Sequence, residues 1–364
     1  IAKKILSGED AIERIEGLVS VIMPSYNTAP YIEETIQSVL NQTYTNIEII
    51  LVDDGGDDKC PDMCRGYAQK DDRVVYVRKE NGGLTSARKK GLETITGDFV
   101  MYVDGDDWLE PQTVQRAVET SIKYDVDITL FGYKRVYEGV TFESSIFEGN
   151  QQFVGTEVQN LHRMLIGPVD SELAHVEKAE RIVTTWGKLY RREIMDKAIF
   201  VSEREVGSSE DAIFNLGVFA VAKKCVYLDE FLYNYRKSNE NSITKKYRAK
   251  LVRQWQCLYQ HFERYIQENG LGQEYKIALN NRIALGMLGI GLNELESDKS
   301  FWKQAKYLRK VLKHPKWENA FKQLDFKYFP MKWKVFYSLC KYKQTELLLI
   351  LLKIIRKLKT KIAR

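Results

Sequence analysis

Three aspartates lie close together after an apolar run in the first third of the chain. The run FVMYV is followed by DGDDW, which brings Asp104, Asp106 and Asp107 within four residues. Carboxylates at this spacing repel one another, and Mg²⁺ or Mn²⁺ would offset the repulsion by taking their oxygens as hard ligands. The alternative is an acidic β-turn, because Asp and Gly are common turn residues. The spacing by itself leaves both interpretations open.

The elements around the acidic cluster alternate between short apolar runs and helical patterns. Helical spacing of apolar residues follows the first run, and PQTVQRAVETSIKY follows the DGDD cluster with a proline near its first turn. Continuously apolar strands that alternate with helices imply an α/β fold, with a mostly parallel, Rossmann-like sheet covered by helices on both faces. We predict its buried strands at 18–23, 47–52, 74–77, 99–103 and 127–133.

Polar clusters follow three of these predicted strands. PSYN occupies 24–27, DDGG occupies 53–56 and DGDD occupies 104–107. Ligands of such sheets bind at the carboxyl ends of the strands. We therefore predict a single nucleotide-sized crevice rather than three unrelated acidic loops, and this favours the cation over the turn.

The remaining composition bounds the class of protein. The chain has 364 residues and a net charge of +5, which predicts about two domains and does not argue for a nucleic-acid partner. Five cysteines lack a framework spacing, and we expect free thiols in a reducing compartment. The N-terminus lacks an apolar signal core and no apolar stretch reaches about 18 residues, so we expect a cytoplasmic protein.

Long helical patterns replace strands late in the chain. The expected organisation is a lead-in at 1–17, a sheet domain at 18–246 and a helical add-on domain at 247–364.

Six motifs in order resemble those of the family 2 inverting glycosyltransferases of the GT-A fold, of the bacterial surface-glycan or glycoprotein type. They are PSYN, VDDG, NGGLTSARKKG, DGDD, WGKLYRR and SSED, and the resemblance covers about 18–244. It implies that a hexose, with galactose or glucose favoured, moves from a UDP-sugar to a glycan, glycoprotein or lipid-linked acceptor. It also implies a Mn²⁺ or Mg²⁺ cofactor. One departure is Gly56, where the family usually has Ser, and we expect a looser loop there.

The resemblance also implies roles for residues on the donor side. Pro24, Tyr26 and Asn27 would line the nucleotide. Asp54 would accept a hydrogen bond from the uracil ring, and Asp53 would assist it or hold the turn.

Residues later in the chain would hold the diphosphate and the metal. Asp106 would be the main metal ligand, with Asp104 on the metal or the ribose. Arg88 would reach the diphosphate or the carboxylate cluster, and Gly83 would let the backbone approach the sugar. Arg236 would reach the diphosphate, or would be a solvated arginine at a strand end.

The resemblance also implies a catalytic base in the SSED motif, whose last two residues are Glu210 and Asp211. Asp211 would take the proton of the acceptor hydroxyl, and Glu210 would orient the acceptor or the loop. Both acids also suit a helix N-terminus capped by Ser208 or Ser209, and the two interpretations are compatible. Trp186 would be a platform for the acceptor sugar or, equally, a core tryptophan.

The end of the chain is a basic, apolar stretch. Residues 332–364 contain one acid, and Lys353 interrupts the run LLLILLKII, which is too short to span a bilayer. A basic amphipathic helix on an anionic membrane surface is one interpretation, and a helix packed on the protein's own core is the other.

Two rival functions remain for the whole protein, a sugar nucleotidyltransferase and an inactive transferase-like binding partner. The early part of the chain lacks the basic glycine-rich loop of the first, and intact DGDD and ED motifs argue against the second.

Overall fold

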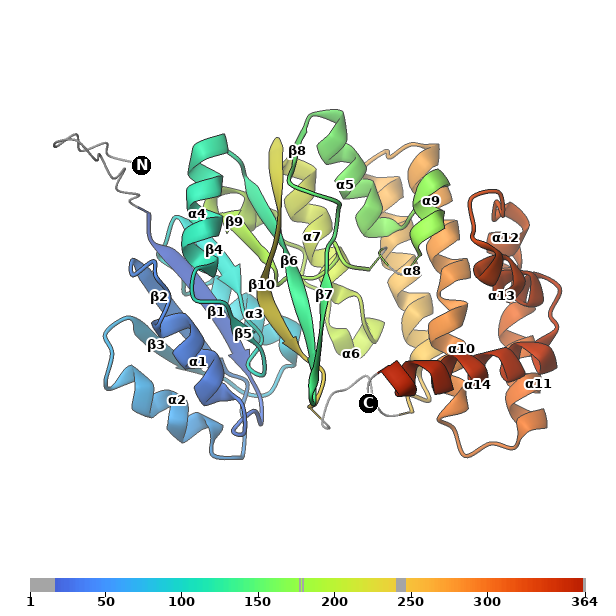
Figure 1. The fold of residues 1–364 in the computed structure, drawn as a ribbon, viewed down its shortest axis with the longest axis horizontal. Coiled ribbons are helices and arrows are strands. Elements are labelled where there is room, and N and C mark those ends of the chain that lie inside the picture. The colour runs from blue at the N-terminus through green and yellow to red at the C-terminus, as the bar shows by residue number, and fades with distance from the viewer. Residues whose placement is uncertain (1–16, 177, 179, 240–246, 363–364) are drawn as a thin grey trace.

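A twisted sheet forms the N-terminal two thirds of the protein, in a computed structural model that describes residues 17–176, 178, 180–239 and 247–362 (Figure 1). Its strands run in the order β3-β2-β1-β4-β9-β6-β10-β5, with β7 paired to β6 and β8 to β10. The strands are β1 Val19–Ser25, β2 Ile47–Asp53, β3 Val74–Arg78, β4 Phe99–Tyr102, β5 Trp108–Leu109, β6 Ile128–Tyr137, β7 Val140–Ser144, β8 Gln151–Val154, β9 Lys188–Arg191 and β10 Lys224–Arg236.

The first four strands are parallel, as the sequence predicted. β1 pairs with β2 and β4, and β3 adds to β2, so the ends of β1 and β2 coincide where Ser25 lies opposite Asp53. β9 runs antiparallel between β4 and β6 and restores the direction of β6 and β10 to that of β1. The carboxyl ends of β1, β2, β4, β6 and β10 therefore lie along one edge of the sheet, and the mostly parallel α/β architecture is confirmed.

Helices cover both faces of this sheet. Alternation along β1 sends Val21 and Met23 into one hydrophobic layer and Ile22 into the other, which is why the strand reads as a continuous apolar run. One face carries α1 Ile32–Leu40, α2 Cys60–Ala68 and α4 Thr113–Tyr124. The other carries α3 Leu84–Leu92, α5 Thr156–Ile166 and α7 Glu210–Val221. Short helices connect these layers, and they are η1 Asp170–His175, η2 Arg192–Lys197 and α6 Glu203–Val206.

The remainder of the described chain is helical and packs beside α5 and α7. Its helices are α8 Leu251–Glu268, α9 Gln273–Leu285, α10 Met287–Leu295, α11 Phe301–Leu312, α12 Pro315–Gln323, α13 Met331–Lys341 and α14 Thr345–Ile362. Tyr265 on α8 donates a hydrogen bond to the carbonyl of Leu216 at 3.1 Å, and the side-chain amide of Asn281 donates to Pro168 at 2.9 Å. The helices thus share a hydrophobic core with the sheet region.

The expected division of the chain into a lead-in, a sheet domain and a helical add-on stays a prediction. The change from strands to helices occurs after β10, whereas the expected boundary at 246/247 adjoins residues outside the described ones, and so does all of the expected lead-in except Gly17. All five cysteines are free thiols. In the described part of the chain, no helix is both long enough and apolar enough to cross a bilayer.

Candidate active site

Three loops at the carboxyl edge of the sheet touch one another. The side chain of Asn27 donates to Asp57 at 2.7 Å and accepts from its backbone N–H at 3.0 Å, which joins the PSYN loop to the DDGG loop. On the other side, a Cβ added to Gly105 would come 2.9 Å from the carbonyl oxygen of Pro24, so the DGDD loop packs directly on the end of β1. Tyr26 is 51% exposed between these loops. The PSYN loop thus contacts both acidic loops, and the single nucleotide-sized crevice between the three clusters stays a prediction.

Asp53 is a structural part of the DDGG turn. Its carboxylate accepts from the backbone N–H of Gly56 at 2.9 Å and from the hydroxyl of Tyr76 at 2.8 Å, and it pairs with Arg78 at 3.1 Å. Gly56 takes the place of the family's serine in this loop, and we expected a looser loop there. The structure instead shows the loop held by these three contacts. Of the two roles left open for Asp53, the contacts support the one that holds the turn.

Asp54 organises the NGG segment that precedes α3. Its carboxylate accepts hydrogen bonds from the backbone N–H groups of Gly82 at 3.0 Å and Gly83 at 2.7 Å, and from the ammonium group of Lys79 at 2.6 Å. Asp54 itself is 2% exposed. A uracil that hydrogen-bonds to Asp54 would have to share the carboxylate with Lys79 or displace that ammonium group.

Gly83 places the start of α3 against a carboxylate from a distant helix. Glu203 on α6 accepts from the backbone N–H groups of Leu84 and Thr85, both at 3.2 Å, and so caps the helix. Gly83 has a φ of +90°, and a Cβ there would collide with the Glu203 carboxylate. This position therefore requires glycine for its conformation and for its close approach to Glu203.

The third carboxylate of the DGDD cluster is buried and structural. Asp107 is fully buried and accepts from the hydroxyl of Tyr233 at 2.7 Å and from the backbone N–H of Arg236 at 2.8 Å. Burial, together with the charges of Asp106 and Asp104, raises the pKa of Asp107 well above its usual value. Asp107 thus fixes the loop to β10, while its two neighbours are the candidates for a ligand.

The residues present fit a divalent cation whose remaining ligands would come from the diphosphate of a sugar donor and from water. Among the described residues, Asp106 accepts a hydrogen bond from the side chain of Asn239 at 2.8 Å, and Asp104 accepts one from Arg88 at 2.8 Å. A carboxylate has about four lone-pair sites on its two oxygens, so these contacts are compatible with metal ligation. Burial raises the pKa of Asp104 against the opposing effect of Arg88. Across the described residues no group of three or more His, Cys, Asp or Glu side chains forms a metal cage. One or two carboxylates plus diphosphate oxygens and water is the usual set for Mg²⁺.

A buried guanidinium joins the DGDD cluster to the ED pair. Arg88 on α3 lies 2.8 Å from Asp104 and 2.5 Å from Asp211, and its own side chain is 4% exposed. Burial alone would lower the pKa of Arg88, but the charges of Asp104 and Asp211 outweigh it and the pKa lies well above the usual value. The second oxygen of Asp211 accepts from the backbone N–H of Thr185 at 3.1 Å. Of the two targets expected for Arg88, the structure shows the carboxylates.

The ED pair opens α7, but without the serine cap that the sequence suggested. Ser209 adopts a left-handed conformation with φ 65° and, among the described residues, its side chain accepts no capping hydrogen bond. The hydroxyl of Ser208 instead accepts from the indole N–H of Trp255 at 3.0 Å. Burial and the adjacent charge of Asp211 raise the pKa of Glu210 to about 7.

The side chains of Arg236 and Trp186 are both held by contacts within the protein. Arg236 donates from Nε to the carbonyl of Asp106 at 2.7 Å, pairs with Glu34 at 2.5 Å and lies over the ring of Trp108 at 4.4 Å. Its guanidinium is thus held on α1 and the DGDD loop, and it is not a solvated strand end. Trp186 is 6% exposed and stacks on Tyr233 at 4.5 Å, and these contacts favour the core alternative.

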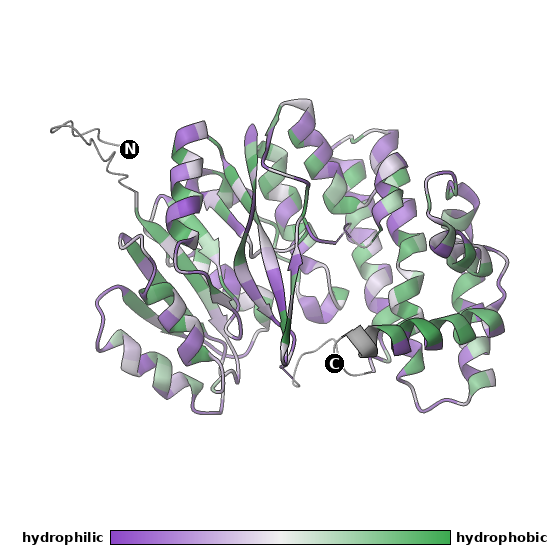
Figure 2. Ribbon diagram, in the orientation of Figure 1, coloured by the Kyte–Doolittle hydropathy of each residue, from purple (hydrophilic) through white to green (hydrophobic). Residues whose placement is uncertain are grey.

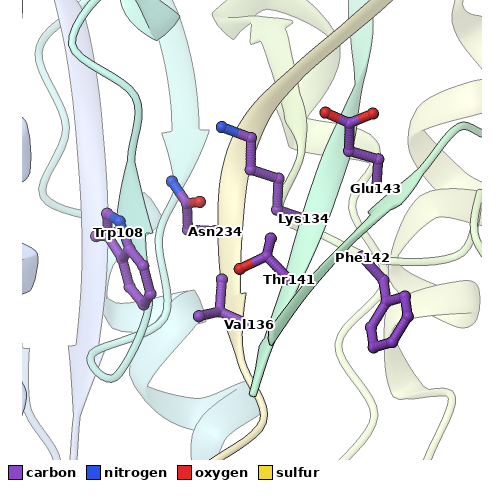
Figure 3. A pocket seen from close by; sticks show the side chains of 7 residues that line it. All are labelled: Trp108, Lys134, Val136, Thr141, Phe142, Glu143 and Asn234. Atoms are coloured by element: carbon purple, nitrogen blue, oxygen red, sulfur yellow. The ribbon is translucent and has the colours of Figure 1, made fainter. Parts of the chain in front are cut away.

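Two hollows adjoin these loops. One, of about 530 Å³, lies beyond the ends of β2 and β3 and is lined by Gly55, Arg78, Lys79, Glu80 and Asn81. It adjoins Asp54 through Lys79, on the side where a nucleoside is expected. The other, of about 590 Å³, lies along β5, β6, β7 and β10. Figure 3 shows Trp108, Asn234 and Lys134 next to one another across these strands.

Sequence reasoning missed several residues that hold the site. Lys79 lies two residues after the predicted strand 74–77, so its place at the sheet edge could have been inferred. Thr185 adjoins the WGKLY motif, which was a weaker signal. Glu203 contacts α3 across a separation of 119 residues, and Tyr233 contacts Asp107 across 126, and nothing local in the sequence marks either pairing.

The comparisons with known proteins agree with this geometry. Residues 20–197 match the family model described as glycosyl transferase family 2. The chain is 32% identical to a protein of Bacillus subtilis (strain 168) named uncharacterized glycosyltransferase EpsJ, over 91% of this chain and 94% of that protein. It is 31% identical to the putative glycosyltransferase EpsH of the same organism, over 78% of each chain. The crystal structure of S. aureus TarS 1-349 in complex with UDP-GlcNAc has a similar fold, with a TM-score of 0.63 and 18% identity over 93% of this chain and 91% of that one. This chain belongs to glycosyl transferase family 2 and is a glycosyltransferase of the GT-A fold.

Proposed function

We propose that the protein is an inverting, metal-dependent hexosyltransferase. It would move galactose or glucose from a UDP-sugar to a glycan, glycoprotein or lipid-linked acceptor. The observation that carries the proposal is the buried Arg88, which holds Asp104 on the donor side and Asp211 on the acceptor side with one guanidinium. Displacement at an anomeric carbon needs a group for the leaving diphosphate and a base for the acceptor, and both must face the same atom.

The donor would lie along the three joined loops. The uridine would occupy the hollow beside Lys79 and Asn81, with the exposed ring of Tyr26 against it and Pro24 and Asn27 beneath. The diphosphate would extend from there to the DGDD loop, past the start of α3. TarS, which shares the fold, was solved with UDP-GlcNAc.

The chemical step would be a single displacement. The acceptor oxygen attacks the anomeric carbon while its proton passes to the carboxylate of Asp211, and the bond from that carbon to the diphosphate oxygen breaks as UDP departs with the electron pair. Arg88 and the N–H of Thr185 orient Asp211 for this transfer. Asp104 and Asp106 would hold Mn²⁺ or Mg²⁺, whose chemistry is to stabilise charge on the leaving diphosphate. Glu210 would orient the acceptor or its loop.

The rival functions make different products. A sugar nucleotidyltransferase would release pyrophosphate from UTP in the presence of a sugar phosphate. An inactive binding partner would bind UDP and release nothing from a UDP-sugar.

With a lipid-linked acceptor, the transferase would work in the cytoplasm as a peripheral protein on the inner face of the cell membrane.

The test is a donor panel without added acceptor. The purified protein is incubated with UDP-galactose, UDP-glucose or UDP-N-acetylglucosamine, and separately with UTP plus the corresponding sugar 1-phosphates. Each incubation contains Mn²⁺ or a chelator, and released UDP and pyrophosphate are quantified. The proposal expects slow, Mn²⁺-dependent release of UDP from one hexose donor. Proton NMR of the released sugar before it mutarotates reports inversion through the anomeric coupling constant. Release of pyrophosphate only, or binding of UDP without turnover on any donor, would reject the transferase.

A further inference from the structure

The last helix of the described chain is apolar on two faces. Leu348, Leu349 and Leu352 on α14 are fully buried against the other C-terminal helices. A second set of large apolar side chains on the same helix is 49–56% exposed, and it consists of Leu347, Ile350, Ile354 and Leu358. A helix that only covered its own protein would need the first face and not the second.

The exposed set forms one continuous stripe, which we call the α14 stripe. Its members follow at intervals of three, four and four residues, the spacing that places side chains in line along a helix. From Leu347 to Leu358 the stripe is about 16 Å long at 1.5 Å per residue. Exposed large hydrophobic residues are ordinary when they are scattered singly, but seven of the thirteen in the described chain fall within 331–358. An aligned stripe of this kind indicates a surface with a partner.

The charge around the stripe selects the partner. Residues 331–364 contain ten Lys and Arg and a single acid, Glu346, which is paired with Arg309 at 2.7 Å. Lys353 and Lys357 are one helical turn apart and follow Ile350 and Ile354 by three residues, which puts them along one edge of the stripe. A second copy of this chain would present the same basic edge and repel it. An anionic surface that is apolar beneath its charge complements both features.

The position of α14 suits such a surface. Figure 1 shows the helix along the lower side of the molecule, the side toward which β6 and β10 end. In Figure 2 most of α14 is coloured hydrophobic along this side, whereas the other surface helices alternate between hydrophobic and hydrophilic turns.

We propose that α14 lies on the surface of an anionic lipid bilayer. The stripe would enter the boundary between headgroups and acyl chains, and Lys353 and Lys357 would meet the lipid phosphates at its edge. The proposal adds a named contact to the function proposed above and rests on that function only for its purpose, the delivery of a lipid-linked acceptor. Binding of the bilayer itself requires neither donor nor acceptor.

The test is cosedimentation of the full chain with vesicles of phosphatidylcholine alone and of phosphatidylcholine mixed with phosphatidylglycerol. We expect binding to the mixed vesicles only, weakened by salt because the basic edge contributes. Ile350→Gln/Ile354→Gln should weaken binding by about tenfold or more, since each apolar methylene withdrawn from the bilayer loses about 0.8 kcal/mol. Lys353→Glu/Lys357→Glu should abolish the preference for the mixed vesicles. Ile277→Gln on α9, also exposed, is the matched control and should bind as the unchanged chain does.

Two results would overturn the proposal. One is equal vesicle binding by the unchanged chain and the Ile350→Gln/Ile354→Gln variant. The other is a dimer in size-exclusion chromatography that this variant converts to a monomer, because the stripe would then be an interface between copies. Circular dichroism checks that each variant is folded, and Mn²⁺-dependent release of UDP in solution should be the same in all of them. Failure of the transferase proposal would appear in that release assay and not in the vesicle assay.

Discussion

The guanidinium of Arg88 lies 2.5 Å from a carboxylate oxygen of Asp211, a residue 123 positions later in the chain. The same guanidinium lies 2.8 Å from Asp104, so one side chain from α3 connects the loop after β4 to the first turn of α7. The two carboxylates are partly buried and close enough to repel each other without it. Arg88 therefore permits Asp104 and Asp211 to lie close together.

Removal of Arg88 should cost both stability and activity. Arg88→Ala leaves Asp104 and Asp211 without their common counter-charge, and loss of one partner of a buried ion pair typically costs about 3–5 kcal/mol. We expect a lower free energy of unfolding in urea and no detectable release of UDP. Lys89→Ala, an exposed neighbour on α3, is the control and should change neither. Normal turnover by a folded Arg88→Ala protein would contradict the central role of this contact.

Exchange of the base should separate binding from turnover. Asp211→Asn keeps the shape and the hydrogen bond from Thr185 but removes the proton acceptor, so UDP affinity should persist while transfer falls by about 10²- to 10⁴-fold. Glu210→Gln should retain measurable transfer. Calorimetric titration of UDP with Mn²⁺ measures the first property, and steady-state kinetics measures the second. If Glu210→Gln were inactive and Asp211→Asn were active, the two roles would be reversed.

Glu210 should make the stability of the fold depend on pH. Burial and the charge of Asp211 raise its pKa from 4.5 to about 7, so between these values the folded protein holds a proton that the unfolded chain releases. This contribution to stability is complete below pH 4.5 and is lost as the pH rises through about 7. Urea unfolding at pH 6 and pH 8 should show a smaller decrease for Glu210→Gln than for the unchanged chain. Glu268→Gln, exposed on α8, should behave as the unchanged chain does, and an identical decrease in all three proteins would refute the assignment.

Substitution of Asp106 and of Asp107 in the DGDD loop should change different properties of the protein. Asp106→Ala removes one hydrogen bond with Asn239, so the fold should remain stable while Mn²⁺ no longer strengthens UDP binding. Asp107→Ala leaves the hydroxyl of Tyr233 and the N–H of Arg236 buried without their acceptor, and should lower the free energy of unfolding by about 2 kcal/mol. Thermal unfolding and UDP titration with and without Mn²⁺ distinguish the two. A metal effect that survives in Asp106→Ala would exclude this residue as a ligand.

Gly83 and Gly66 offer a matched pair of glycines. Gly83→Ala introduces a Cβ at φ +90° against the carboxylate of Glu203, and should destabilise the fold by about 1–3 kcal/mol and weaken UDP-sugar binding as the start of α3 moves. Gly66 lies inside α2 with open space around it, so Gly66→Ala should be neutral or stabilise by up to about 1 kcal/mol. Thermal unfolding compares them. Equal effects would show that Gly83 is not conformationally required.

Much of the sheet was predictable because its strands carry their own signal. The runs at 18–23, 47–52, 74–77 and 99–103 are apolar on both faces, and β1 to β4 lie there as parallel strands. The less regular part of the chain gave no such signal. β7, β8 and β9 fall in or just after the segment 134–183, and β9 enters the sheet as an antiparallel strand whose neighbours are β4 and β6.

The positions of the side chains were likewise predictable in part. The DDGG and DGDD clusters follow predicted strands, so their meeting at one edge could be inferred from parallel topology alone. The orientation of Arg236 could not, because its target Glu34 lies 202 residues away and the contact exists only once the end of β10 and α1 have come together in the fold. The burial of Trp186 likewise depends on Tyr233, which β10 places beneath it.

The sequence by itself determined the fold class, the family and the set of acids, because strand and helix periodicity and motif order are local properties of the chain. Only the tertiary structure decided which acids face the site and which hold it together. Asp54, Asp107 and Asp211 are chemically alike, and each acquires its surroundings from segments far away in the chain. The free energy of a buried charge depends on those surroundings, and residue order does not contain them.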